Sequence, residues 1–126
     1  KNYIFVLLGS AFGGAARYWL SNFVYLFLPS SFPYGTLSVN VIGSFILGLV
    51  FFFSENSLSF SPNLRIFLTI GFCGGFTTFS TFSLETVNLL QSSQYLYAIV
   101  NIFSNVILSI GITILSYFLI KYLFGG

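Results

Sequence analysis

The sequence carries very little charge, and it has no histidine and no aspartate. Only 5% of its 126 residues are Lys, Arg or Glu, whereas about 25% of the residues in an ordinary soluble domain are charged. Without histidine and aspartate the common acid and base pairs of enzymes are missing, so an enzyme is not expected. A single cysteine, Cys73, excludes an internal disulfide and a cysteine-based zinc site.

Apolar side chains fill the sequence instead: 56% of the residues are hydrophobic, with 18 Phe and 8 Tyr. A soluble fold of this size could not bury so much apolar surface. Four runs reach the roughly 20 residues that a membrane-spanning helix needs. We therefore predict one all-α integral membrane domain over residues 1–126, with spans at about 3–28, 36–53, 64–90 and 94–124.

The few positive charges give a weak signal for orientation in the membrane. With four spans both termini lie on one side, which Lys1, Arg65 and Lys121 share, while the opposite loops have no Lys or Arg. This bias predicts cytoplasmic termini. Because so few charges specify the orientation, insertion both ways round stays open as an alternative.

The third run is interrupted by glycines, hydroxyl residues and one carboxylate between positions 71 and 85. Backbone groups freed inside a bilayer persist only where protein buries them or where they line a polar pathway. We predict a break in the helix at Gly74-Gly75, with a second half-helix beginning at Thr77 or Thr78. Carbonyls at such a break, doubled by a symmetry mate, suit a small hard cation. The alternative is a simple kink stabilised by the threonine hydroxyls.

Polar residues form stripes along the predicted helices, at four-residue steps that place them on one face. The stripes of the second, third and fourth runs are Thr36, Asn40, Ser44 and Gly48; Thr77, Thr81 and Glu85, flanked by Ser80 and Ser83; and Tyr97, Asn101, Asn105, Ser109, Thr113 and Tyr117. Interhelical packing is one interpretation. Amides are costly to bury and need several partners, so a ladder of them favours a track for a polar solute. In the first run, Gly9 and Gly13 form a GxxxG pair that we assign to packing.

The chemistry of such a track favours a small anion. Arg65 and Lys121 lie near the ends of their predicted spans, so only Arg17 and Glu85 are expected to carry charge deep inside the membrane, and a permeant ion would meet mostly neutral amides and hydroxyls. Phe79 and Phe82 share a helix face, and the electropositive edges of aromatic rings suit an anion. Core packing is the alternative for the two phenylalanines. A functional role and a structural salt bridge or hydrogen bond are both open for Arg17 and Glu85.

Two motifs resemble the CrcB, or Fluc, family of fluoride channels: GTLSVN at positions 35–40 and GFCGGFTTFSTFSLE at positions 71–85. The likeness extends over essentially the whole chain, including Gly13, Arg17-Tyr18-Trp19 and the stripe of the fourth run. It implies a passive fluoride-selective channel of a prokaryotic inner (plasma) membrane, which exports cytoplasmic fluoride and gives fluoride resistance. It also implies an antiparallel dual-topology homodimer, with two pores at the subunit interface and a structural sodium ion at the centre. A heterodimer with a paired gene product is an alternative.

The resemblance also assigns roles to individual positions. The ring edges of Phe79 and Phe82 would face fluoride, and Asn40 matches the pore asparagine. Backbone carbonyls of Gly74 and Thr77, from both subunits, would hold the sodium ion. The remaining residues of the polar pore track are Thr81, Ser83, Glu85, Asn105, Ser109 and Thr113.

Two further positions complete the comparison with the family. Arg17 matches a first-span arginine that helps to draw anions to the pore vestibule. Asn105 departs from the pattern, because family members commonly have histidine, serine or another polar residue there. We expect fluoride and the lipid bilayer as partners, no nucleic acid and no organic cofactor.

A selective fluoride pathway is physically reasonable for this sequence. Fluoride is small and strongly hydrated, so a narrow file of amides, hydroxyls and aromatic edges must replace its water shell. Two rival functions remain. A small multidrug transporter has a similar size and dual topology, but its chemistry depends on a first-span carboxylate, and this chain has Arg17 there. A non-transporting assembly subunit would use the Asn and Ser stripes only to join helices.

Overall fold

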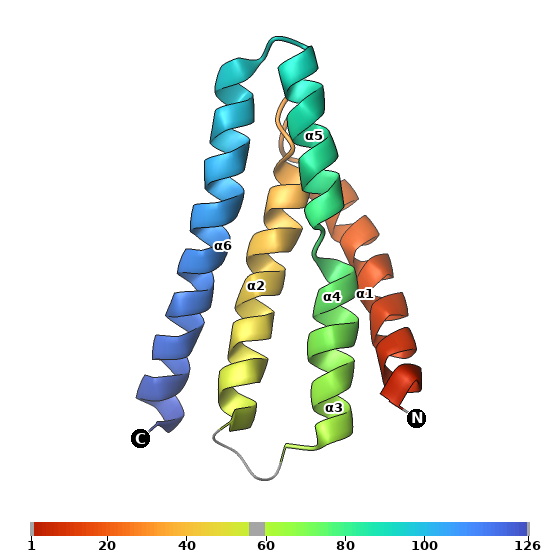
Figure 1. The fold of residues 1–126 in the computed structure, drawn as a ribbon, viewed down its shortest axis with the longest axis vertical. Helices are drawn as coiled ribbons and strands as arrows, with labels where there is room; N and C mark the ends of the chain where they lie inside the picture. Colours follow the sequence, from red (N-terminus) through yellow and green to blue (C-terminus); the bar gives the residue numbers. More distant parts are fainter. Residues whose placement is uncertain (1, 56–59, 126) are drawn as a thin grey trace.

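The computed structural model describes residues 2–55 and 60–125, which form an all-helical bundle (Figure 1). Four segments within this part of the chain are long and apolar enough to cross a membrane: Asn2–Val24, Tyr34–Glu55, Pro62–Gln91 and Tyr95–Phe124. The predicted all-α membrane protein with four spans is therefore confirmed, with ends that differ by a few residues. The first, second and fourth segments are the single helices α1 (Asn2–Val24), α2 (Tyr34–Glu55) and α6 (Tyr95–Phe124).

Both described ends of the chain lie at one end of the bundle, where α2 also ends and the third segment begins (Figure 1). Arg65 in the last turn of α3 and Lys121 in the last turn of α6 belong to this end. The predicted grouping of these two cations on one side of the membrane agrees with this arrangement. Lys1 and residues 56–59 of the predicted second connection lie outside the described residues.

The third segment consists of several pieces. It begins with α3 (Pro62–Ile66), continues as the π-helical η1 (Phe67–Cys73) and α4 (Gly74–Phe76), and resumes after an interruption as α5 (Phe79–Gln91). Thr77 and Thr78 have extended backbone, with ψ angles of 161° and 119°. We call these two residues the break.

The predicted position of the break, Gly74-Gly75, is therefore wrong. Both glycines stay helical in α4. Gly75 serves instead for close packing, because a Cβ there would lie only 2.7 Å from the Ser10 carbonyl oxygen of α1. The helix stops two residues later, since Thr78 caps α5: its Oγ1 accepts a hydrogen bond from the Thr81 amide at 3.2 Å.

Small residues let the helices approach closely. Gly9 and Gly13 of α1 pack against η1, and a Cβ on Gly9 would lie 2.9 Å from Gly71 Cα, while one on Gly13 would collide with the Phe72 carbonyl. The packing role predicted for this pair is confirmed. Between α2 and α6, Gly48 makes room for Ser116, whose hydroxyl contacts the Phe45 carbonyl at 3.1 Å.

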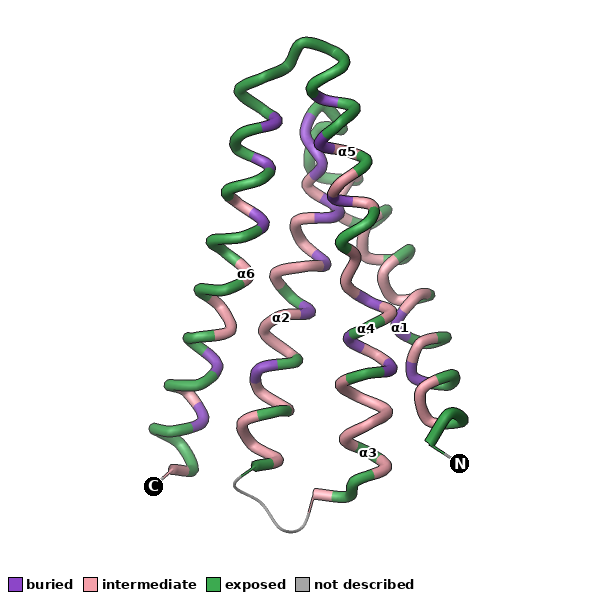
Figure 2. Tube along the Cα trace, viewed as in Figure 1, coloured by how far each residue is buried: buried purple, intermediate pink, exposed green. Residues whose placement is uncertain are grey.

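The buried positions follow the inner faces of the helices, and most other positions are exposed (Figure 2). Polar residues are prominent inside: Thr36, Thr86, Asn101, Asn105 and Ser116 are all buried. Large apolar side chains are exposed on every span, as expected for a surface that meets lipid or a second copy of the chain. Hydrogen-bonding groups therefore lie on the inner faces of the bundle, away from lipid, where several of them bond to one another.

Candidate functional site

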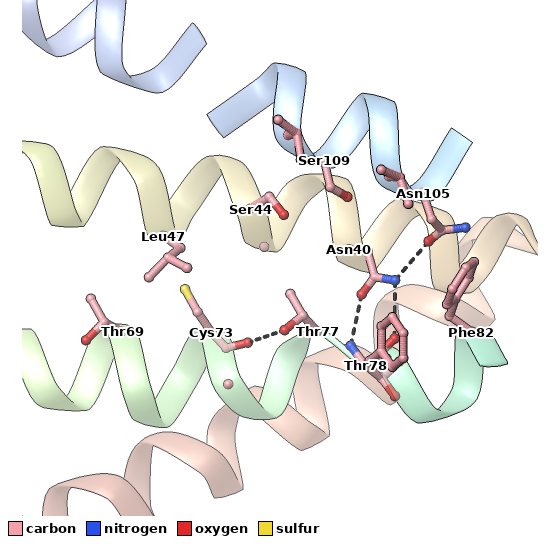
Figure 3. A pocket seen from close by; sticks show the side chains of 15 residues that line it. Asn40, Ser44, Leu47, Thr69, Cys73, Thr77, Thr78, Phe82, Asn105 and Ser109 are labelled. Atoms are coloured by element: carbon pink, nitrogen blue, oxygen red, sulfur yellow. Dashed lines mark hydrogen bonds between the residues drawn. The ribbon is translucent and has the colours of Figure 1, made fainter. Parts of the chain in front are cut away.

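A pocket of ≈ 430 Å³ opens beside the break, between α2, α6 and the pieces of the third segment (Figure 3). It is lined by Asn40, Gly43, Ser44, Leu47, Thr69, Cys73, Gly74, Thr77, Thr78, Phe79, Phe82, Asn105, Val106, Ser109 and Ile110. The polar groups are amides, hydroxyls and backbone, and no lining residue is charged. The pocket can therefore offer neutral hydrogen-bond donors and aromatic edges to a small solute.

The pocket brings together seven of the twelve positions predicted for the site: Asn40, Gly74, Thr77, Phe79, Phe82, Asn105 and Ser109. The other five, Arg17, Thr81, Ser83, Glu85 and Thr113, are not among its lining residues. Thr78 and Ser44 line the pocket without having been assigned to it. Ser44 could have been found, because it belongs to the same predicted stripe as Asn40, one helical turn further along.

Asn40 holds the backbone of the break (Figure 3). Its Oδ1 accepts from the Thr78 amide at 2.9 Å, and its Nδ2 donates to the Thr78 carbonyl at 3.3 Å. The same Nδ2 donates to Asn105 Oδ1 at 2.9 Å. One side-chain amide thus replaces hydrogen bonds that a continuous helix would have made. The contact of Asn40 with a permeant ion stays a prediction.

Asn105 continues this network toward residues that the prediction left out of the site. Its Nδ2 donates to both the carbonyl and the Oδ1 of Asn101, each at 2.9 Å. Asn101 Nδ2 in turn donates to Thr86 Oγ1 at 3.0 Å. Asn101 could have been suspected from its place in the stripe of the fourth run, one turn before Asn105. Nothing in the sequence pattern singles out Thr86, because it lies off the predicted stripe of the third run.

The two phenylalanines occupy the first turn of α5, with ring centroids 5.4 Å apart at an interplanar angle of 53°. Their environments differ sharply. Phe82 is buried, with 8% of its surface exposed, while Phe79 is 77% exposed. Phe82 therefore packs within its own chain, whereas most of the Phe79 ring faces outward, toward lipid or a second copy.

The hydroxyls on the α5 side of the site are mostly engaged locally. Ser83 donates to the Phe79 carbonyl at 3.0 Å, and Thr81 Oγ1 accepts from Thr78 Oγ1 at 3.1 Å. On α6, Thr113 donates to the Ser109 carbonyl at 2.9 Å. Each of these contacts is local to one segment and joins no neighbouring helix. The place of the three side chains on the polar track therefore stays a prediction.

Two buried polar atoms have no hydrogen-bond partner in the described part of the chain: Glu85 Oε1 and Ser109 Oγ. Polar atoms buried without a partner are costly, so each of the two is a candidate for contact with a solute or a second copy. Ser109 lines the pocket, whereas Glu85 lies on α5 near Thr36 and Tyr25. Ser109 is accordingly the free hydroxyl best placed to serve a solute in the pocket.

Arg17 contacts the backbone that precedes the break, in α4, whereas Asn40 contacts the break itself. Its Nε donates to the Gly75 carbonyl at 3.1 Å. In a continuous helix that carbonyl would accept from the amide of Phe79, but the interruption removes this partner. A guanidinium here also compensates the partial negative charge at the end of α4. The structure therefore favours a structural contact for Arg17, and the partner is a carbonyl rather than Glu85.

The backbone near the break also has a donor set that a small cation could use. The Thr78 amide, the regular helical partner of the Gly74 carbonyl, bonds to Asn40 instead. Gly74 is exposed and lines the pocket, and a Cβ on it would meet no atom within 4 Å. Carbonyl oxygens are the ligand type that a hard cation prefers. The predicted residues Gly74 and Thr77 fit a sodium ion in this respect, and the site stays a prediction.

The fold and the site define a small polytopic membrane protein with a polar, uncharged pocket beside an interrupted spanning helix. Comparison with known families identifies the family within this class. The family model described as CrcB-like protein, Camphor Resistance (CrcB), matches residues 4–117, and the chain belongs to this family. The resemblance inferred from the sequence is confirmed.

Relatives with high identity carry a more specific name. The chain is 51% identical over 104 residues to the fluoride-specific ion channel FluC of Citrifermentans bemidjiense, covering 82% of this chain and 84% of the relative. It is 50% identical over 105 residues to FluC of Magnetococcus marinus, with 83% and 85% covered. It is 46% identical over 110 residues to FluC of Coxiella burnetii, with 86% and 89% covered.

Proposed function

We propose that the chain is a passive, fluoride-selective ion channel and not an enzyme. It exports cytoplasmic fluoride across a prokaryotic inner (plasma) membrane and gives fluoride resistance. The observation that carries this proposal is the combination of about 50% identity to fluoride-specific channels with an uncharged polar pocket at the break. Fluoride moves down its electrochemical gradient, without ATP or proton coupling.

Selectivity comes from replacing the water shell of a small anion with neutral donors. The pocket supplies the hydroxyls of Ser44 and Ser109 and the electropositive edges of Phe79 and Phe82. Donors of moderate strength bind the ion weakly enough for it to leave again. A larger halide is excluded because the same donors cannot close around it.

The channel is an antiparallel dual-topology homodimer with two pores at its interface. The open side of the pocket, the outward ring of Phe79 and the exposed Gly74 support a second copy at this face. The unsatisfied Ser109 Oγ supports it as well, because a partner or ion could complete its hydrogen bonding. A heterodimer with a related chain would present the same kind of surface.

Gly74 and Thr77 would hold a structural sodium ion through their carbonyls, contributed by both subunits. Such an ion would supply a fixed positive charge beside the partial negative charge of these carbonyls. The carbonyl of Gly74, freed by the bond between Thr78 and Asn40, is the support for this assignment. Thr81, Ser83, Glu85, Asn105 and Thr113 complete the polar track in the dimer, and Arg17 lies at its vestibule.

Passive efflux from proteoliposomes tests the function directly. Purified protein is reconstituted in lipid, and fluoride release under an imposed gradient is followed with a fluoride electrode, with chloride as the control anion. We expect rapid fluoride release and no chloride release. In Phe82→Ile, which lacks the aromatic edge, we expect release to slow by about tenfold or more, since each ~1.4 kcal/mol lost is a factor of ten. Wild-type liposomes that stay tight to fluoride would overturn the proposal.

The assembly subunit is the competing function with specific support, because both hydrogens of Asn40 Nδ2 are engaged within the chain. Such a subunit needs its hydrogen bonds only to join helices. It would show no fluoride release at any protein density, while remaining folded and membrane-inserted. Wild-type release therefore separates the two functions.

A further inference from the structure

A chain of side-chain hydrogen bonds begins at the backbone of α5 and crosses to α6. Thr86 Oγ1 donates to the Phe82 carbonyl at 2.8 Å, and Asn101 Nδ2 donates to Thr86 Oγ1 at 3.0 Å. Asn105 Nδ2 then donates to Asn101 Oδ1 at 2.9 Å. Each bond points in the same direction, from α6 back toward the Phe82 carbonyl.

The same chain continues from α6 to α2 and ends at the break. Asn40 Nδ2 donates to Asn105 Oδ1 at 2.9 Å, and the Thr78 amide donates to Asn40 Oδ1 at 2.9 Å. We call Thr86, Asn101, Asn105 and Asn40 the amide relay. The relay joins two backbone groups of the same segment, the Phe82 carbonyl and the Thr78 amide, through side chains from three helices.

The two ends fix the direction of the relay. A carbonyl can only accept and a backbone amide can only donate. The hydroxyl of Thr86 has one hydrogen, which it donates to the Phe82 carbonyl, so Thr86 Oγ1 can only accept from Asn101. Asn101 must therefore turn its NH₂ group to Thr86 and its oxygen to Asn105. Reversing one amide would bring two oxygens or two NH₂ groups face to face.

The buried part of the relay does not reach the pocket. Asn101 is 0% exposed, and Thr86 is also buried. Neither residue is among those that line the pocket, whereas Asn105 and Asn40 are. Because no water reaches such a site, a reversed or unpaired amide there would be costly. Thr86 and Asn101 can thus act on the pocket only through the orientation of the next two amides.

We propose that Thr86 and Asn101 are positioning residues of the channel. They fix which way the amides of Asn105 and Asn40 face, and through Asn40 they hold the extended backbone at Thr78. The inference rests on the proposed channel function and adds to it a reason for two buried polar residues that never touch the ion.

Substitutions at Thr86 test the relay with little change in shape. Thr86→Val removes the hydroxyl and leaves the Asn101 NH₂ group without an acceptor, whereas Thr86→Ser restores the hydroxyl. Asn88→Ala is the matched control, since Asn88 is an exposed amide on the same helix. Asn101→Asp, which can no longer donate to Thr86, gives a second test if Thr86→Val is not monodisperse. All variants are compared with wild type as full chains in lipid nanodiscs and proteoliposomes.

Two measurements are made on each variant: fluoride efflux, and hydrogen exchange of the Thr78 amide by mass spectrometry. The exchange measurement is independent of any flux. Side-chain hydrogen bonds in membranes lose about threefold to twentyfold in equilibrium population when one partner is removed. We expect exchange at Thr78 to accelerate by about this factor in Thr86→Val, and efflux to fall in parallel, with Thr86→Ser and Asn88→Ala close to wild type.

Other outcomes would overturn the proposal in recognisable ways. Unchanged exchange with reduced efflux in Thr86→Val would mean that Thr86 acts on the ion and not on the break. Faster exchange with unchanged efflux would mean that the relay holds the break without serving the pore. If Thr86→Val matches wild type in both fluoride efflux and Thr78 exchange, the relay neither holds the break nor affects the pore. If wild-type protein does not release fluoride, the channel function fails, while the exchange data still decide whether the relay holds Thr78.

Discussion

At the break, two side chains replace backbone hydrogen bonds that a continuous helix would make for itself. Arg17 donates to the Gly75 carbonyl on one side, and Asn40 takes both the amide and the carbonyl of Thr78 on the other. A bilayer offers no water for these groups. The site can therefore keep an irregular backbone only while both residues stay in place, and each of them can be tested alone.

Arg17→Met should destabilise the protein by about 1–3 kcal/mol, since it removes a charged donor from the half-buried Gly75 carbonyl. Thermal unfolding in detergent measures this as a lower midpoint temperature. Arg65→Met is the control: Arg65 lies in α3 at the end of the bundle and contacts the Phe51 ring at 4.9 Å, so its loss should cost less. Equal midpoints for the two variants would show that the hydrogen bond from Arg17 to the Gly75 carbonyl does not stabilise the protein.

Asn40→Asp should abolish most fluoride efflux while leaving the helices formed. A carboxylate can still accept from the Thr78 amide, but it cannot donate to Asn105 Oδ1 or to the Thr78 carbonyl. Two pairs of oxygens would then face each other. Asn22→Asp on the exposed face of α1 introduces the same charge and should leave efflux close to wild type. Efflux in Asn40→Asp near the wild-type rate would show that the hydrogen bonds donated by Asn40 are dispensable for the pore.

At the scale of helices, close packing decides where the third segment is irregular. Gly9, Gly13 and Gly75 bring α1 against η1 and α4 with backbone in contact. The sequence pattern identified the glycine pair of α1 correctly, because GxxxG has a fixed spacing on a helix. It placed the break too early, since a glycine pair can serve either flexibility or close approach, and only the neighbouring helix decides which.

Gly13→Ala and Gly14→Ala form a matched pair of adjacent substitutions. A Cβ at Gly13 collides with the Phe72 carbonyl, whereas one at Gly14 meets nothing within 4 Å. Gly13→Ala should lose about 1–3 kcal/mol of stability through overpacking. Gly14→Ala should be neutral, or gain up to about 1 kcal/mol from the better helix propensity of alanine. Midpoints of unfolding in detergent, compared side by side, check the sign of each effect.

At the scale of the whole molecule, hydropathy and a long motif determined most of what could be predicted. Four apolar runs define four spans because a bilayer demands continuous apolar length. The stripes at Asn40 and Asn105 identified the helix faces that meet in the pocket. The π-helical stretch η1 and the role of Thr86 could not be predicted, since they depend on contacts between helices that are distant in sequence.

The surface around the open pocket leads to a prediction about assembly. Gly74 is exposed, and a Cβ there would meet no atom within 4 Å outside its own turn of helix, so the protomer alone should tolerate a large residue at this position. If two copies meet at the break, Gly74→Trp would place a bulky ring between them. We expect this variant to keep its helix content and to elute as a monomer, with molecular mass measured by light scattering in detergent.

Leu7→Trp provides the control for that assembly test. Leu7 is 68% exposed on α1, and α1 packs against η1 and α4 through its glycine-bearing face. A tryptophan on this exposed position should therefore leave the wild-type mass unchanged. Gly74→Trp protein that remains a dimer would show that the two copies do not meet at the break. The sodium site and the shared pores proposed for that face would then lose their structural basis, because both require carbonyls and rings from two chains at one place.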